Sequence, residues 1–325
     1  MRSATHMTFG DPAEVLALAE AEKPAPAPGQ VLIRTLLSPI HNHDLWTVRG
    51  QYGYKPNLPA IGGSEAVGIV EALGDGVTGV AVGQRVATAG VHGAWAEYVV
   101  ASAKGLVPVP DPIPDEAAAQ LIAMPFSALT LLEFLEVKEG DWVVQNTANG
   151  MVGKTLAMLA GARGVHVINL VRRDAGVAEL AALGIGNAVS TASEGWQDQA
   201  RALTGGAPIV AAVDSVGGSA SSDLLGLLGD GGMLVSFGSM TGEPMQISSG
   251  DLIFKQAVIK GFWGTKVNAA LAPDARARLF GELLRLVATG ALKLPVEAVY
   301  PLDRIGEAVA ASLAPGKAGK VLLKP

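Results

Sequence analysis

The sequence predicts an α/β protein of two domains, one rich in β-strands and one built on a doubly wound parallel sheet. Its 325 residues are enough for two domains of ordinary size. Up to about residue 110, short apolar runs are separated by turns rich in Pro and Gly, which is typical of β-rich structure. From residue 142 onward, continuous apolar runs alternate with amphipathic helical segments, which indicates a parallel sheet covered on both faces.

The first part is expected to contain strands that end at turn residues. The clearest strands and the turns between them are Val31–Leu37, Gly68–Val70 and Arg85–Ala89, with Pro24–Gln30 and Gly74–Gly83. A helical stripe then predicts a helix over Glu116–Leu135, in which Pro125 is a candidate interruption.

The second part alternates strand and helix. The expected strands are Trp142–Asn146, Val165–Val171, Ile209–Val213, Met233–Phe237 and Ala257–Phe262. The expected helices between them are Gly150–Leu159, Val177–Leu183, Gln197–Leu203 and Ala220–Leu228. The tail adds a helix at Asp274–Thr289, a strand at Ala298–Tyr300, a helix at Ile305–Leu313 and a strand at Lys320–Leu323.

The composition of the chain excludes several classes of partner and of catalytic site. The net charge is −6 and no basic run exceeds two residues, so nucleic acid and anionic membranes are not expected partners. The absence of cysteine excludes disulfides, thiolate metal sites and a cysteine nucleophile. Apolar stretches are too short to cross a bilayer and Met1–Gly10 has no signal pattern, so a cytoplasmic protein is expected.

A dinucleotide fingerprint follows the strand predicted at Trp142–Asn146. Its residues are Ala148, Asn149, Gly150, Met151, Val152 and Gly153, an A-x-G-x-x-G pattern. Gly150 would let the backbone approach a pyrophosphate, and Gly153 would let the helix pack closely on the sheet. The helix N-terminus would attract the phosphates. The alternative is a tight strand-to-helix turn without a ligand, but the βαβ context favours a cofactor.

The end of the second predicted strand indicates which nicotinamide cofactor binds. NAD sites place an acidic residue about 20 positions after the fingerprint. Here Arg172 and Arg173 occupy that region, and no acid precedes Asp174. Two guanidinium groups suit the 2′-phosphate of NADPH, so NADPH is the expected cofactor. The alternative is a pair of solvated arginines at a strand end.

With these motifs in place, the chain resembles the medium-chain dehydrogenase/reductase superfamily, and within it the zinc-free branch of mitochondrial-type enoyl thioester reductases and quinone oxidoreductases. The similar segments are Arg49–Gly53, Leu58–Glu65, Gln145–Asn149, Ser215–Gly218, Phe237–Met240, Leu252–Lys255 and Lys260–Trp263. The resemblance implies a GroES-like catalytic domain of residues 1–119 and 266–325, and a Rossmann domain of residues 120–265. It also implies a homodimer that pairs through the strand at Ala257–Trp263.

Zinc is not expected. Zinc alcohol dehydrogenases of this superfamily use a cysteine ligand and the histidine of a Gly-His-Glu motif, whereas His41 and Ser64 stand at these positions here. Metal-capable side chains remain at His41, His43, Asp44 and Glu65, which leaves a metal site open as an alternative. The neutral serine argues against it, because zinc sites prefer a full set of nitrogen and sulfur donors.

The resemblance also implies the catalytic residues. Reduction of an activated C=C bond needs no Lewis acid, and a phenol can protonate or hydrogen-bond the enolate. The family's catalytic tyrosine corresponds to Tyr52, and its pocket tryptophan to Trp263. The alternatives are a turn tyrosine packed beside Pro56, and an aromatic residue of a core or interface.

Further cofactor contacts follow from the same resemblance. They are His41, Ser127, Phe237, Gly238, Ser239, Met240, Trp263 and Lys320, each of which could instead be an ordinary turn or surface residue. His41 replaces an asparagine common in zinc-free relatives, and Tyr54 and Lys55 stand where aliphatic residues are usual. The expected function is NADPH-dependent reduction of α,β-unsaturated thioesters or ketones. The alternatives are a quinone oxidoreductase and a non-catalytic NADPH-binding protein.

Overall fold

The chain folds into two units, each with its own sheet and core. The structure, a computed structural model, describes residues 1–325. Unit 1 comprises Met1–Ala123, Leu283–Thr289 and Leu294–Pro325, and unit 2 comprises Met124–Glu282 and Gly290–Lys293. No helix in the structure has the length and apolar character that crossing a membrane requires.

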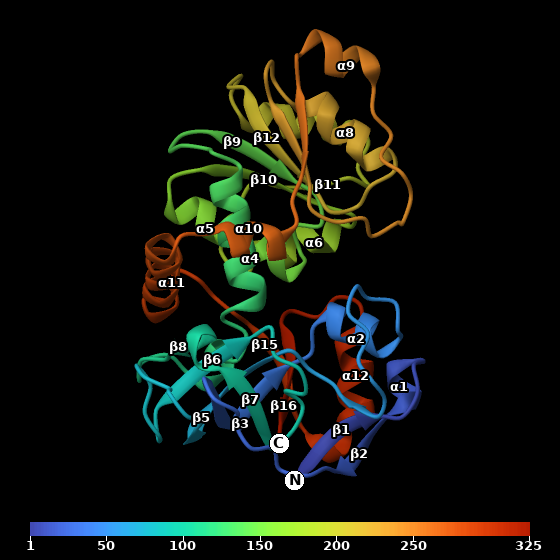
Figure 1. Cartoon of the computed structure of the whole chain (residues 1–325). Helices are drawn as coiled ribbons and strands as arrows, with labels where there is room; N and C mark the ends of the chain where they lie inside the picture. The colour runs from blue at the N-terminus through green and yellow to red at the C-terminus, as the bar shows by residue number, and fades with distance from the viewer. The chain divides into compact units, whose positions relative to one another are not determined.

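Unit 2 contains a six-stranded, wholly parallel sheet in the order β11-β10-β9-β12-β13-β14 (Figure 1). The strands are β9 (Trp142–Gln145), β10 (His166–Val171), β11 (Ala188–Ser190), β12 (Ile209–Asp214), β13 (Met233–Ser236) and β14 (Val258–Gly261). The helices that follow them are α5 (Met151–Ala162), α6 (Asp174–Ala181), α7 (Trp196–Leu203), α8 (Ser219–Leu227) and α9 (Ser249–Phe254).

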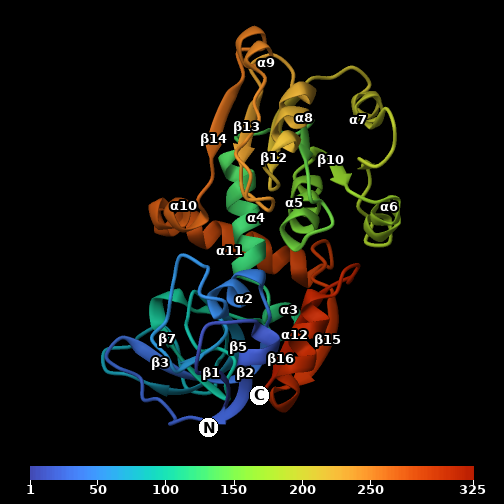
Figure 2. The ribbon, with the colours of Figure 1, turned by 90° about the vertical axis from the view of Figure 1, so that its right-hand side faces the viewer.

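The strands of this sheet are covered on both faces. Ile168 and Leu170 of β10 pack in one buried cluster with residues of α7 and α8. Val171, which points to the opposite face, packs in a second cluster with Leu180 of α6 and with α5. The prediction of a doubly wound parallel sheet is therefore confirmed, and Figure 2 shows the same layers from the side.

Unit 1 contains a sheet in the order β15-β16-β3-β5-β6-β8, with β7 paired to β3, and a smaller sheet in the order β2-β1-β4. Its strands are β1 (Arg2–His6), β2 (Leu16–Glu20), β3 (Gln30–Pro39), β4 (Ala60–Ile61), β5 (Glu65–Leu73), β6 (Arg85–Ala89), β7 (Tyr98–Ser102), β8 (Val107–Pro108), β15 (Val296–Pro301) and β16 (Lys320–Lys324). Its helices are α1 (Pro12–Val15), α2 (Asn42–Val48), α3 (Asp115–Ala118) and α12 (Ile305–Leu313), with 3₁₀ turns η1 (Ala103–Gly105) and η2 (Leu302–Arg304).

The helix expected over Glu116–Leu135 is divided into α3 and α4 (Ala123–Phe134), so that expectation is wrong. The break has a clear cause. The backbone N–H groups of Ile122 and Ala123 donate to the carboxylate of Glu65, at 2.6 and 2.9 Å, instead of to carbonyl groups of a preceding helical turn. Pro125 lies in the first turn of α4, where its missing N–H costs no helical hydrogen bond.

The domain boundary expected near residue 265 also differs from the structure. Residues 266–282, which include most of α10 (Gly264–Ala270) and most of α11 (Pro273–Ala288), belong to unit 2. Side-chain contacts explain this. Phe280 stacks on Phe126 with ring centroids 4.2 Å apart, and Glu282 pairs with Arg163 at 2.8 Å. These contacts join α11 to the body of unit 2.

Candidate functional site

The fingerprint loop of unit 2 joins β9 to α5, as its sequence predicts. Gly150 is the N-cap residue of α5. A Cβ on Gly153 would lie 2.7 Å from Ala148 Cα and 2.8 Å from Thr147 O, closer than side-chain carbons come to backbone atoms. Only glycine fits at this position, because the first turn of the helix packs directly against the preceding loop. The free N–H groups of this turn lie at the carboxyl end of the sheet, where such folds hold phosphates.

A buried polar network beside this loop was not anticipated from the sequence. Asn146 Nδ2 donates to Asp214 Oδ1 at 2.7 Å, and Asn146 Oδ1 accepts from the backbone N–H of Ser215 at 2.7 Å. Asp214 also accepts from the backbone N–H groups of Val216 and Gly217. These bonds join the ends of β9 and β12 beside the fingerprint loop. The signal available in the sequence was a polar residue at the end of each apolar strand.

The two arginines expected to bind a 2′-phosphate lie in different surroundings. Arg173 Nη2 pairs with Glu179 Oε1 at 3.1 Å, and Glu179 also accepts a long hydrogen bond of 3.5 Å from Asn149 Nδ2. Arg172 is exposed and forms no ion pair in the structure. The structure thus brings Arg173 and Asn149 together through Glu179, a residue of α6 that sequence reasoning did not single out.

The remaining candidate residues of unit 2 lie near the ends of β13 and β14. Phe237 stacks on Phe262 with centroids 5.6 Å apart. Trp263 is the N-cap residue of α10 and is 68% exposed, so it is not a core residue of unit 2. A Cβ on Gly264 would lie 3.7 Å from Ser127 Oγ. In the Gly238–Met240 turn, the backbone N–H of Met240 donates to Ser215 O at 3.1 Å, which joins the turn to the end of β12.

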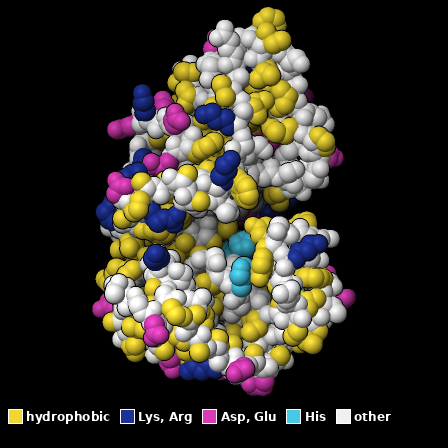
Figure 3. All heavy atoms as spheres, in the orientation of Figure 1, with side chains coloured by type: hydrophobic (Ala, Val, Ile, Leu, Met, Phe, Trp, Pro, Cys, Tyr) yellow, Lys and Arg dark blue, Asp and Glu magenta, His cyan; other side chains and the backbone are white.

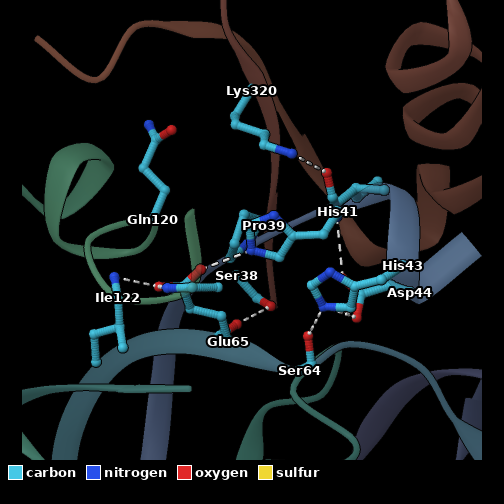
Figure 4. A network of polar contacts seen from close by, with 12 residues as sticks. Ser38, Pro39, His41, His43, Asp44, Ser64, Glu65, Gln120, Ile122 and Lys320 are labelled. Atoms are coloured by element: carbon cyan, nitrogen blue, oxygen red, sulfur yellow. Dashed lines mark hydrogen bonds and ion pairs between the residues drawn. The ribbon is translucent and has the colours of Figure 1, made fainter. Parts of the chain in front are cut away.

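In unit 1, His41 and Glu65 form a fully buried pair, which Figure 4 shows from close by. His41 Nε2 lies 2.6 Å from Glu65 Oε2. His41 is the N-cap residue of α2, and its backbone N–H donates to Asp44 Oδ2 at 3.0 Å. Glu65 is the first residue of β5 and is separated by Ser64 from Gly62 and Gly63. These two glycines pack against the ring of the buried Trp95 so closely that no side chain fits at either position.

Burial shifts the two ionisations in opposite directions. It raises the pKa of Glu65 to about 7 and lowers the pKa of His41 well below its ordinary value. Near neutral pH and below, the pair therefore holds one proton on the carboxyl group and carries little net charge, which avoids the cost of a buried ion pair. His41 Nδ1 is buried and has no hydrogen-bond partner.

Lys320, expected at the cofactor, lies beside this pair. Lys320 is the first residue of β16, and its Nζ donates to the backbone carbonyl of Ile40 at 3.3 Å. Burial lowers the pKa of Lys320 to about 8. A lysine that is only partly solvated and has a single backbone partner retains donors for a polar ligand.

Tyr52 belongs to the same part of unit 1. It is 48% exposed, and its hydroxyl group makes no hydrogen bond in the structure. Its ring stacks on His43, with centroids 5.7 Å apart, and His43 stacks on His41 at 5.0 Å. His43 Nε2 lies 2.8 Å from Ser64 Oγ. The structure therefore brings together three of the predicted residues, His41, Tyr52 and Lys320.

The donor set at these positions does not fit a zinc ion. His41 Nε2 and both oxygens of Glu65 are directed at protein partners. Ser64 bonds the imidazole of His43. No three His, Asp or Glu side chains in residues 1–325 converge as metal ligands would.

Comparison with known proteins places the chain. Residues 27–111 match the alcohol dehydrogenase GroES-like domain, and residues 152–279 match the zinc-binding dehydrogenase domain. The chain is 33% identical to the human mitochondrial enoyl-[acyl-carrier-protein] reductase, over 99% of its own length and 88% of the relative's. The rat enzyme is 34% identical, over 97% of this chain and 86% of its own.

Two solved structures of quinone oxidoreductases share the fold of the whole chain. A mycobacterial quinone oxidoreductase is 28% identical with a TM-score of 0.88, and all of both chains is covered. The Escherichia coli quinone oxidoreductase complexed with NADPH is 26% identical with a TM-score of 0.86, again over both whole chains. The predicted resemblance and the predicted GroES-like domain are confirmed. The chain is an oxidoreductase of the medium-chain dehydrogenase/reductase superfamily and belongs to the family of the mitochondrial enoyl-[acyl-carrier-protein] reductases.

Proposed function

We propose that this protein uses NADPH to reduce the activated C=C bond of α,β-unsaturated thioesters or ketones. The observation that carries the proposal is the half-exposed Tyr52, whose hydroxyl group has no protein partner and is free to bind a substrate. The enoyl reductases cited above, similar over nearly the whole chain, support the same reaction.

The chemistry needs one hydride and one proton. Bound NADPH supplies the hydride to the carbon β to the carbonyl group, and negative charge then develops on the carbonyl oxygen. The Tyr52 phenol is a suitable donor to that oxygen, because a neutral phenol stabilises developing charge without needing to ionise. A catalytic role is also proposed for Trp263, whose side chain is exposed at the start of α10.

Cofactor contacts are proposed within each unit. In unit 2, the close packing at Gly153 and the free guanidinium group of Arg172 suit a pyrophosphate and a 2′-phosphate respectively. In unit 1, Lys320 is a proposed cofactor contact, because its ammonium group donates to only one backbone carbonyl and keeps further donors. The other residues proposed to line the cofactor are His41, Ser127, Asn149, Gly150, Met151, Val152, Arg173, Phe237, Gly238, Ser239, Met240 and Trp263.

A substrate panel tests the proposal directly. Crotonyl and longer enoyl thioesters, enones and small quinones would each be mixed with the protein and NADPH, and loss of NADPH absorbance followed. Turnover of enoyl thioesters or enones, with saturated products identified by mass spectrometry, is the expected result. Tight NADPH binding without turnover of any electrophile would instead indicate a non-catalytic binding protein.

Quinone reduction is the second candidate. Two quinone oxidoreductases share the complete fold, with TM-scores of 0.88 and 0.86. A chain that reduces quinones faster than every enoyl thioester would favour this candidate, which uses the same cofactor.

We also propose a homodimer through the edge strand β14. Val258 on this strand is exposed, and Phe254 at the end of the adjacent α9 is 85% exposed. An open edge flanked by apolar side chains is an aggregation hazard that a symmetric partner would cover. Light scattering at micromolar concentration should give twice the chain mass. The cytoplasmic location stays a prediction, since the curated relatives above are mitochondrial proteins.

A further inference from the structure

Three aromatic rings in unit 1 form a column that passes from the interior to the surface. The His41 ring is fully buried, the His43 side chain is 25% exposed, and Tyr52 is 48% exposed. Successive rings are nearly parallel, at 15° and 30°. His43 is therefore the titratable side chain that touches Tyr52, and it also reaches solvent. Figure 3 shows histidine side chains at the surface on one face, with apolar side chains beside them.

The orientation of the His43 ring is held from several sides. Its Nε2 lies 2.8 Å from Ser64 Oγ and 3.5 Å from Asp44 Oδ1. Its backbone carbonyl accepts from Thr47 Oγ1 at 2.8 Å, within α2. Two oxygen atoms near Nε2, one of them a carboxylate oxygen, favour a proton on this nitrogen. The only hydrogen bond of the ring is the one at Nε2, and the side chain is 25% exposed, so Nδ1 is available to a ligand.

Two different donors thus stand face to face at the surface of unit 1. A phenol suits the hydrogen bond that an enolate oxygen requires, because its O–H group is a donor. An imidazole suits complete proton transfer, because either ring nitrogen can carry a proton and pass it on. Reduction of an activated C=C bond needs both events, one at the oxygen and one at the neighbouring α carbon.

We propose that His43 is a second catalytic residue, which donates the proton to the α carbon while Tyr52 hydrogen-bonds the enolate oxygen. Ser64 is its positioning residue. This inference rests on the proposed function. A hydride, which NADPH would supply in becoming NADP⁺, forms the C–H bond at the β carbon, and the electron pairs of the C=C and C=O bonds shift so that the enolate carries its charge on oxygen. The Nδ1–H bond of the His43 imidazolium breaks as the α carbon takes the proton, and solvent then reprotonates the ring.

Two substitutions of His43 distinguish a catalytic role of this residue from a structural role. His43→Gln keeps a polar partner for Ser64, and His43→Phe keeps the ring stack against His41 and Tyr52. Both remove the proton donor. Each should lower kcat on the best enoyl thioester by about 10²-fold or more, the usual effect of losing a positioned acid. The Kd for NADPH should stay within about twofold. His166→Gln is the control, because His166 is an exposed histidine stacked on Trp142 in unit 2.

The stereochemistry at the α carbon gives a readout that a structural role would not change. A 2-methyl-2-enoyl thioester would be reduced in D2O, and the configuration of the deuterated α carbon determined. The wild-type chain should give one configuration, because one fixed donor delivers the deuteron. His43→Gln and His43→Phe should give a mixture, because solvent then protonates the enolate from either side.

Ser64 provides a graded test of positioning. Ser64→Ala should lower kcat by several-fold with little change in KM, because the ring keeps its proton but loses its orientation. Ser64→Thr keeps the hydroxyl group and should restore most of the rate. Equal rates in Ser64→Ala and the wild type would contradict the positioning role.

The outcomes distinguish this inference from the proposed function. Wild-type rates and a single α configuration in a folded His43 variant would overturn the inference and leave the proposed function intact. A wild-type chain that reduces no enoyl thioester or enone would overturn both. A rate lost in His43→Gln but retained in His43→Phe would assign His43 a packing role and also overturn the inference.

Discussion

Units 1 and 2 each contain residues proposed to bind ligand, and the two sets of residues are built in different ways. In unit 2, the residues proposed to bind the phosphates of the cofactor lie within short segments of sequence, in the loop between β9 and α5 and just after β10. In unit 1, the pair of His41 and Glu65 spans 24 positions, and the bond from Lys320 to Ile40 spans 280. A site made from one local motif can be predicted from spacing, whereas a site assembled from distant segments needs the fold.

The largest effect is expected in unit 1, at Tyr52. Tyr52→Phe removes the free hydroxyl group and little volume, so turnover of enoyl substrates should fall about 10²–10⁴-fold. NADPH affinity should barely change, which steady-state kinetics and fluorescence titration would show. Tyr98→Phe is the matched control, since Tyr98 lies in β7 under the ammonium group of Lys23. Wild-type turnover in Tyr52→Phe would remove the main support for the proposed mechanism.

The next effect concerns the arginines of unit 2. Replacing Arg172 and Arg173 with Ala should weaken NADPH binding by tens-fold or more while leaving NADH nearly unchanged, because each lost charged hydrogen bond costs about 1.5–3 kcal/mol. Isothermal titration with both cofactors measures this. Glu179→Gln should act in the opposite direction, since it releases Arg173 from its ion pair. Equal losses for the two cofactors would refute the assignment of NADPH to these residues.

A smaller effect tests whether the local motif acts through backbone packing. Gly153→Ala places a Cβ 2.7 Å from Ala148 Cα, so it should destabilise the chain by about 1–3 kcal/mol. Gly161→Ala in the same helix meets no atom within 4 Å and should stabilise it by about 0.5–1 kcal/mol. Urea titrations of both variants give the free energies of unfolding. Equal changes in the free energy of unfolding of the two variants would mean that the close packing at Gly153 does not require glycine.

The smallest expected effect is the pH dependence of stability that the buried pair of His41 and Glu65 produces in unit 1. The folded pKa of Glu65 is raised to about 7, so its contribution to stability is present at low pH and is lost as pH rises from about 4.5 to 7. The folded pKa of His41 is lowered, so its contribution is present above about pH 6.5 and is lost as pH falls. In the wild type the two dependences oppose each other between about pH 4.5 and 6.5.

Single substitutions should therefore reveal opposite slopes. His41→Asn leaves Glu65 alone, and its free energy of unfolding should decrease from pH 5 to 7 relative to the wild type. Glu65→Gln leaves His41 alone, and its free energy of unfolding should increase from pH 5 to 6.5. One proton limits either slope to about 1.4 kcal/mol per pH unit. Urea titrations at several pH values would detect it, and parallel curves for both variants would rule out the shared proton.

The prediction of secondary structure succeeded where the local pattern was strong. The bounds of β6 and α12 agree with the expected Arg85–Ala89 and Ile305–Leu313. By contrast β1, whose sequence is Arg-Ser-Ala-Thr-His, has no apolar run, and it went unrecognised. Its Ser3 and His6 are nonetheless buried, because the strand lies between β2 and β4. Short strands of this kind are formed by their pairing partners, which local propensity does not contain.

The sequence by itself determined the two-part α/β organisation, the dinucleotide fingerprint and the superfamily, because glycine spacing and apolar periodicity are local properties. Only the tertiary structure decided what the polar residues of unit 1 do. It buried Glu65 against His41, joined it to the backbone of Ile122 and Ala123, and placed His43 between a buried imidazole and an exposed phenol. Such contacts depend on which distant segments meet and on how much water is excluded there, and both arise only when the chain folds.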